Sequence, residues 1–104
     1  MSDQPPLLAD AVEAFVASLR QGSVPINTVK SYAHDLRLFV QAMPADLPQI
    51  SADSIAEFLA AFDHLSVATR RRRYSTLCAF YHWLIRHGVV ETNPMERLDP
   101  ISGP

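Results

Sequence analysis

Hydrophobic residues recur every three or four positions along most of this chain, which is the spacing of amphipathic α-helices. Four such stretches are separated by turn-forming residues, and no stretch alternates between apolar and polar positions as a half-buried strand would. A short further turn is expected after Asn93-Pro94. The pattern predicts an all-α fold whose helices cover residues 7–22, 27–43, 52–62 and 66–88.

Residues with strong preferences for helix ends mark the boundaries. Asn27 or Thr28 is expected to cap the second helix, and Asp53 stands in the first turn of the third, where the helix dipole favours an acid. Gly22 is the expected stop of the first helix, and Gly88 is suited to the left-handed residue that follows a helix end.

The apolar faces of the four helices define one expected core. Tyr32, Tyr74 and Tyr81 all fall on these faces, so we interpret the tyrosines as core residues. The core is predicted to contain Phe15, Val29, Tyr32, Leu36, Phe39, Ile55, Phe58, Leu59, Leu77, Phe80, Tyr81 and Leu84.

Length and composition fit a single globular domain. With 48% hydrophobic and only 19% charged residues, the 104-residue chain can close a core and is unlike a disordered segment. The single cysteine cannot form an intramolecular disulfide, which favours a reducing compartment. The sequence has no 18-residue apolar run and no basic signal-peptide start, so we expect a cytoplasmic protein without a membrane partner.

Charge is segregated along a chain whose net charge is only −2. Positions 40–66 contain acids but no lysine or arginine, whereas positions 64–90 contain arginines but no acid. The four consecutive arginines at 70–73 begin the fourth helix, where the helix dipole disfavours positive charge. Either a polyanion compensates them, or the acids of the preceding segment do, namely Asp53, Glu57 and Asp63.

Two helices are predicted to present polar surfaces. On the fourth, Arg72, Ser75, Ala79, His82 and Arg86 fall opposite the apolar side. On the second, Asp35 is interpreted as an acid that reduces the positive charge of the outward face. That face consists of Asn27, Lys30, His34, Arg37 and Gln41, flanked by Thr28 and Ser31.

Two motifs on these helices resemble a known family. "TVKSYAHDLRLF", residues 28–39, is similar to the T-x-x-x-Y-x-x-D-L-x-x-F pattern in the second helix of the tyrosine recombinase core-binding domain. "TRRRRYSTLCAFYHWLIRHGVVETNP", residues 69–94, resembles the fourth helix and exit of that SAM-like domain of phage integrases. Cys78 and Tyr74 depart from the family pattern, which often has Arg and Leu there.

The resemblance implies a four-helix SAM-like bundle that forms half of a clamp around duplex DNA during site-specific recombination or integration. Its second and fourth helices would cross the major groove. Its partners would be DNA and, on DNA, other recombinase protomers, with the isolated domain monomeric and without a cofactor. The implied DNA contacts are Thr28, Lys30, Ser31, His34, Arg37, Thr69, Arg71, Arg72, Arg73 and Ser75.

The family's catalytic tyrosine and its Arg, Lys and His partners lie in a separate C-terminal domain. The resemblance therefore implies that residues 1–98 are a DNA-binding domain with no catalytic residue. Residues 99–104 would be a linker towards a catalytic domain that this chain lacks, so the chain alone is not expected to cleave DNA.

Other functions remain open from the sequence. A helical module that binds another protein could use the acidic third and basic fourth helices as complementary surfaces, and a helix-turn-helix regulator is a further alternative. Cys78 and His82 stand four residues apart, but a zinc site needs four convergent ligands, so no metal is expected.

Overall fold

The computed structural model describes residues 5–62 and 64–98. Within these ranges, every named secondary-structure element is a helix. The expected all-α bundle of four helices is confirmed, and so is the short turn after Asn93. The expected linker at 99–104 lies outside the described residues. In chain order the elements are α1 (Leu8–Gln21), α2 (Ile26–Ala42), η1 (Leu47–Gln49), α3 (Ala52–Ala60), α4 (Val67–Arg86) and η2 (Pro94–Arg97).

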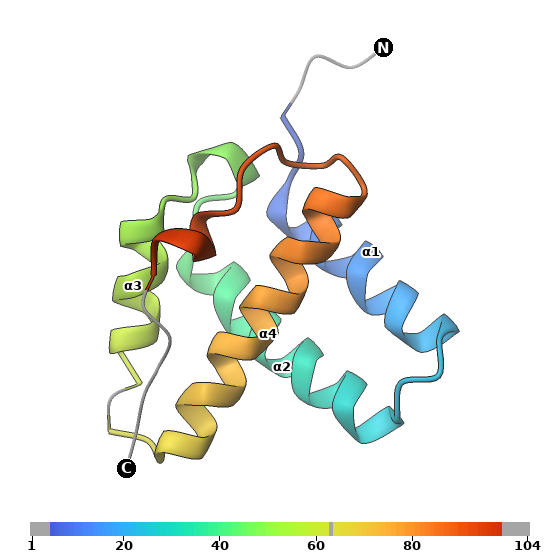
Figure 1. Cartoon of the computed structure of the whole chain (residues 1–104), viewed down its shortest axis with the longest axis horizontal. Coiled ribbons are helices and arrows are strands. Elements are labelled where there is room, and N and C mark those ends of the chain that lie inside the picture. The colour runs from blue at the N-terminus through green and yellow to red at the C-terminus, as the bar shows by residue number, and fades with distance from the viewer. Residues whose placement is uncertain (1–4, 63, 99–104) are drawn as a thin grey trace.

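The long helix α4 organises the bundle. α1 and α2 form an antiparallel pair, and α4 runs across both of them (Figure 1). α3 packs on the other side of α4, where η2 returns the chain to contact both α3 and α4. Because α2 and α4 touch directly, polar residues beside their contact come close together in space, although they are far apart in sequence.

The segment before α1 is fastened to the connection between α2 and η1. The Leu8 amide donates to the Ala45 carbonyl at 2.8 Å, and the Leu47 amide donates to the Pro6 carbonyl at 3.0 Å. Leu7 and Asp46 form an isolated antiparallel bridge between these bonds. This pairing satisfies backbone groups at two helix boundaries, and hydrophobic periodicity gives no sign of it.

The start of α2 differs from the expectation. The helix begins at Ile26 behind Pro25, so the prediction that Asn27 or Thr28 caps it is wrong. Pro25 has a φ of −58°, which prepares the chain for helix, and its carbonyl accepts from the amides of Thr28 and Val29. The Thr28 amide, which a side-chain cap could have satisfied, is therefore bonded to a backbone carbonyl instead.

The other helix ends largely follow the sequence. Ser51 and Ser66 cap α3 and α4, accepting from the amides of Ser54 and Thr69. Gly88 follows α4 with a φ of 69°, as expected of a left-handed residue. Gly22 does end α1, but in an extended conformation.

The core is close to the predicted one. Every expected member is buried except Tyr32 and Leu59, which are half-buried against it. Phe15 is central, with its ring 5.5 Å from that of Phe80 and 5.7 Å from that of Trp83. The core also includes further residues of α1 and residues in or next to η1 and η2, namely Leu8, Ala11, Val16, Leu47, Ile50 and Met95.

All three tyrosines pack on the core, as predicted. Tyr32 and Tyr74 are half-buried, and Tyr81 is buried with its hydroxyl lacking a hydrogen-bond partner among the described atoms. Burial raises the pKa of Tyr81 because the phenolate would be poorly solvated. A hydroxyl held in this way is not available as a nucleophile.

Within the described ranges, no helix has both the length and the apolarity needed to cross a lipid bilayer.

Candidate nucleic-acid interface

The predicted polar face of α2 is present in the folded chain. Its members Asn27, Lys30, His34, Arg37 and Gln41 are all exposed. The flanking Thr28 and Ser31 are half-buried, so only part of each side chain reaches the surface. The face carries the basic side chains of Lys30, His34 and Arg37 on successive turns, which is a surface suited to an anionic partner.

Asp35 is the main correction to this face. Its residue surface is only 2% exposed, so it does not belong to the outward set. It follows His34 but precedes the fully buried Leu36, which places it at the edge of α2 that meets α4. Arg72 of α4 donates two hydrogen bonds to the Asp35 carboxylate, from Nε to Oδ2 at 3.1 Å and from Nη2 to Oδ1 at 2.7 Å.

Two more α4 residues complete this buried cluster. Arg73 donates from Nε to Asp35 Oδ1 at 3.3 Å, and the hydroxyl of Thr76 donates to Oδ2 at 3.0 Å. The same Thr76 hydroxyl also lies 3.0 Å from the Arg72 carbonyl, so its single proton is shared between two acceptors. We call Asp35, Arg72, Arg73 and Thr76 the Asp35 cluster. It ties α2 to α4 at the point where the two polar faces approach each other.

Arg73 is the predicted site residue that lies inside the fold. Its side chain is 10% exposed, and its guanidinium carbon stands 4.1 Å from the centre of the Phe62 ring. Its Nη1 has no hydrogen-bond partner among the described atoms. The guanidinium is therefore held between a carboxylate and an aromatic face, where its role is to stabilise the packing of α4.

The four arginines, which look alike in the sequence, occupy four different environments. Arg70 is half-buried and donates from Nε to the Leu65 carbonyl at 3.3 Å, closing the turn before α4. Arg71 is exposed, Arg72 is 41% exposed along its side chain, and Arg73 is buried.

For Arg72 and Arg73, the compensating acid is not the one expected from the preceding segment. The ion pairs of Arg72 and Arg73 go to Asp35 of α2, and not to Asp53 or Glu57 of α3. The expected partner Asp63 lies outside the described residues. Arg72 is exposed, as expected, but one edge of its guanidinium is fixed by the buried carboxylate of Asp35.

Electrostatics reinforce the cluster. The hydrogen bonds to Asp35 raise the pKa of Arg72; burial opposes this in part, and the negative charge of Asp35 adds a smaller increase. Arg72 therefore stays protonated at any physiological pH. Two arginines share one carboxylate, so the cluster as a whole keeps a positive charge at the surface of α4.

The remaining predicted α4 residues lie near this cluster. Ser75 is exposed one turn after Arg72. Thr69 is half-buried, and its Oγ1 accepts from the capping Ser66 hydroxyl at 3.0 Å. Further along, His82 and Arg86 are exposed as expected, whereas Ala79 is half-buried.

Cys78 and His82 are not joined by a third metal-ligating side chain among the described residues. Cys78 is a half-buried free thiol, and burial raises its pKa although a hydrogen bond with Tyr74 acts in the opposite direction. The thiol is thus less reactive than an exposed one at neutral pH. Nowhere in the described ranges do three His, Cys, Asp or Glu side chains gather as a metal ion would require.

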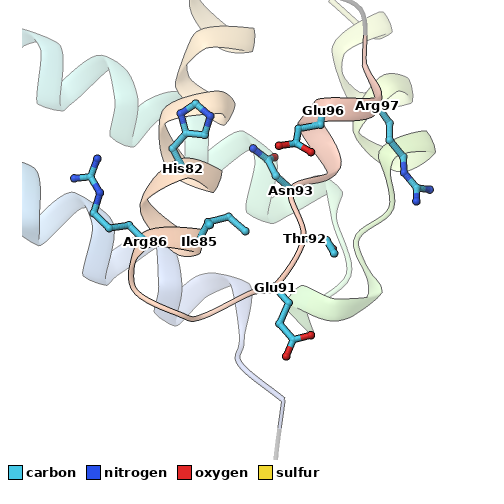
Figure 2. Close-up of a pocket in the computed structure, with 8 residues that line it drawn as sticks. All are labelled: His82, Ile85, Arg86, Glu91, Thr92, Asn93, Glu96 and Arg97. Carbon is cyan, nitrogen blue, oxygen red and sulfur yellow. The ribbon is translucent and has the colours of Figure 1, made fainter.

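A hollow of about 570 Å³ opens where α4 ends and the chain returns through η2 (Figure 2). The side-chain oxygen of Asn93, a residue that lines the hollow, already accepts a hydrogen bond from the Met95 amide at 2.9 Å. The lining mixes both charge signs, and Arg86 and Arg97 point away from its centre in Figure 2. The hollow is lined by His82, Ile85, Arg86, Glu91, Thr92, Asn93, Glu96 and Arg97. The hollow therefore concentrates neither positive charge for an anionic ligand nor negative charge for a cationic one.

The fold and this pair of polar helices define a SAM-like domain of the integrase type. Residues 12–88 match the family model described as "Phage integrase, N-terminal SAM-like domain", and the chain belongs to this family. The resemblance inferred from the two motifs is thereby confirmed.

Curated relatives are tyrosine recombinases. The chain is similar to the tyrosine recombinase XerD-like protein of Streptococcus uberis, with 31% identity over 77% of this chain and 30% of the relative. It is also similar to tyrosine recombinase XerC of Xanthomonas campestris, with 30% identity over 90% of this chain and 31% of the relative. The chain thus spans about a third of the length of these relatives, and it corresponds to the N-terminal domain of such an enzyme.

Solved structures share the fold. A lambda integrase tetramer bound to a Holliday junction superposes with a TM-score of 0.87 at 21% identity, covering 99% of this chain and 30% of that one. A lambda integrase dimer bound to a COC′ core site gives a TM-score of 0.86 at 20% identity, covering 98% of this chain and 30% of that one.

Sequence reasoning missed the Asp35 cluster although its parts were visible. Asp35 is the D of the D-L pair in the first motif, and Arg72 and Arg73 are two of the arginines in the second. An acid beside a buried leucine, on a helix that otherwise carries basic residues, was the available signal. It points to a structural ion pair, and only the packing of α2 on α4 identifies the partners.

Proposed function

We propose that this chain is a DNA-binding domain of a tyrosine recombinase, which holds duplex DNA with α2 and α4 during recombination or integration. The observation that carries the proposal is the joining of two polar helix faces at the Asp35 cluster. The 20 residues of α4 include no acid, and α2 contributes exposed basic residues beside the same contact. A polyanion is the partner that such a surface favours.

The exposed residues divide by chemistry. Lys30, Arg37 and Arg71 are suited to phosphate contacts, because each is an exposed cation. His34 and Ser75 lie beside the α2–α4 contact and can exchange hydrogen bonds with base edges. The hydroxyls of Thr28, Ser31 and Thr69 would add phosphate contacts. Arg73 supports the interface from inside the fold through Asp35.

The relatives support this function. The similar lambda integrase structures are described as bound to a Holliday junction and to a core site, and the curated relatives are tyrosine recombinases. Strand cleavage in a whole recombinase of this kind would belong to a domain outside these 104 residues. We therefore propose that this chain alone binds DNA without cleaving it or forming a covalent adduct.

A salt titration of duplex binding tests the proposal. We expect a dissociation constant of about 10⁻⁴–10⁻⁶ M at physiological salt, typical of largely electrostatic attachment. In Lys30→Ala/Arg71→Ala, which removes one exposed cation from each helix, the slope of log K against log salt should become shallower by roughly 1.8, because each lost phosphate contact changes it by about 0.9. Fluorescence anisotropy with a labelled duplex measures both quantities.

Arg20→Ala/Arg97→Ala is the matched control. It removes the same charge from exposed positions on α1 and η2, outside the proposed interface. Circular dichroism melting shows that each variant is folded. Equal slopes for the two double variants would contradict the proposed helices, and failure of the wild type to bind any duplex at low salt would leave a protein-binding helical module as the better interpretation.

We also propose that the isolated chain is monomeric and meets other protomers only on DNA, as its relation to recombinases suggests. Sedimentation of the free protein at low micromolar concentration should give a single species of about 11.6 kDa. A stable dimer or tetramer without DNA would contradict this.

A further inference from the structure

We propose that Arg72 reads a guanine in the major groove, and that buried Asp35 is the positioning residue that holds it for this task. The inference rests on the proposed function and deepens it. It separates Arg72 from the neighbouring arginines by the chemistry of its contact, since the sequence alone presents all of them as equivalent cations.

The hydrogen bonds of Arg72 leave one edge of its guanidinium available. A guanidinium has five N–H groups, and Asp35 occupies the Nε–H and one N–H of Nη2. The end formed by Nη1 and Nη2 keeps two parallel N–H groups. The side chain is 41% exposed, so this end can reach a ligand at the surface of α4.

The anchor of Arg72 is itself buried and hydrogen-bonded by several groups. Asp35 is 2% exposed, and it is held by Arg73 and Thr76 as well as by Arg72. An ordinary surface arginine loses much of its rotamer freedom when it binds, whereas Arg72 has lost it already on folding. Two N–H donors in a fixed fork can bind one arrangement of acceptors and exclude another, whereas a mobile arginine could adjust to both.

Guanine matches this fork better than the alternatives. Its O6 and N7 are two acceptors side by side, whereas adenine offers N7 beside an N6 donor that would oppose the second N–H. A phosphate could also accept both N–H groups, but the Asp35 carboxylate offsets the charge that attracts phosphates. Lys30 and Arg71 are exposed cations on the same two helices, and they suit phosphates better.

Selection from a randomised duplex library, read by sequencing, tests this with wild type and Arg72→Lys. Lysine keeps the charge and can still pair with Asp35, but it offers a point charge in place of a fork. We expect wild type to prefer guanine at one position by roughly 5- to 150-fold, the range of a good bidentate contact. Arg72→Lys should reduce that preference to about twofold or less, with little change in affinity for random duplex.

Chemical substitution in the selected duplex supplies a second readout. Replacing the preferred guanine with 7-deazaguanine removes the N7 acceptor, and it should weaken wild-type binding about tenfold or more. The same replacement should leave Arg72→Lys binding unchanged. Asp35→Asn weakens the anchor but keeps Arg72, and it should lower the guanine preference. Arg71→Ala should weaken binding to all duplexes but leave the guanine preference unchanged.

The outcomes separate the inference from the proposed function. If wild type binds no duplex at low salt, both are wrong. If wild type and Arg72→Lys bind duplexes with the same base preference, or if Arg72→Lys weakens all sequences equally, the inference alone is overturned and Arg72 is a phosphate or structural residue.

Discussion

Replacing Asp35 with alanine should lower the free energy of unfolding by about 3–5 kcal/mol, the cost of removing one partner from a buried ion pair. The carboxylate accepts hydrogen bonds from Arg72, Arg73 and Thr76, and the buried Arg73 would lose its counter-charge. For a domain of this size, a loss of 1 kcal/mol lowers the melting temperature by roughly 4–8 °C. Urea denaturation followed by circular dichroism measures the change.

Asp53→Ala is the matched control for charge and size. Asp53 is exposed in the first turn of α3, so its loss should cost about 1 kcal/mol or less. A double-mutant cycle with Arg73→Ala isolates the buried pair, because the double variant should lose clearly less stability than the sum of the single variants. Strict additivity, or an Asp35→Ala variant as stable as Asp53→Ala, would show that the cluster contributes little to the fold.

Truncating Phe80 to alanine should destabilise the domain by a similar amount, about 3–5 kcal/mol. Phe80 is fully buried, and its ring lies 5.5 Å from the rings of both Phe15 and Tyr81. The truncation opens a cavity between α1 and α4 that the surrounding rings can fill only in part. Chemical denaturation gives the loss of stability, and circular dichroism in water checks that the variant remains folded.

Ile85→Ala on the same helix provides the comparison. Ile85 lies on the same helix as Phe80, but it is 38% exposed. Its truncation removes less buried surface and should cost about 1 kcal/mol or less. If the two variants were equally stable, the assignment of Phe80 to the centre of the core would be wrong.

Much of the candidate interface could be predicted from the sequence, but not the environment of each residue within it. Helical spacing placed Lys30, His34 and Ser75 on exposed faces, and the structure agrees. It could not distinguish Arg71, Arg72 and Arg73, because consecutive residues of one type differ only in which neighbours they meet. Those neighbours belong to another helix, so their identity depends on how α2 and α4 cross.

The sequence by itself determined the helices, most of their ends and the apolar core, because these depend on local preferences and on periodicity. Phe80 and Leu36 were predictable for this reason, as was Gly88 with its positive φ. Only the tertiary structure decided that Asp35 is buried and that it holds two arginines. The acid and its partners are 37 and 38 positions apart, and an ion pair between helices leaves no periodic trace along either one. The burial of a charge is settled by the groups that approach it across the packed interface, and local sequence does not contain them.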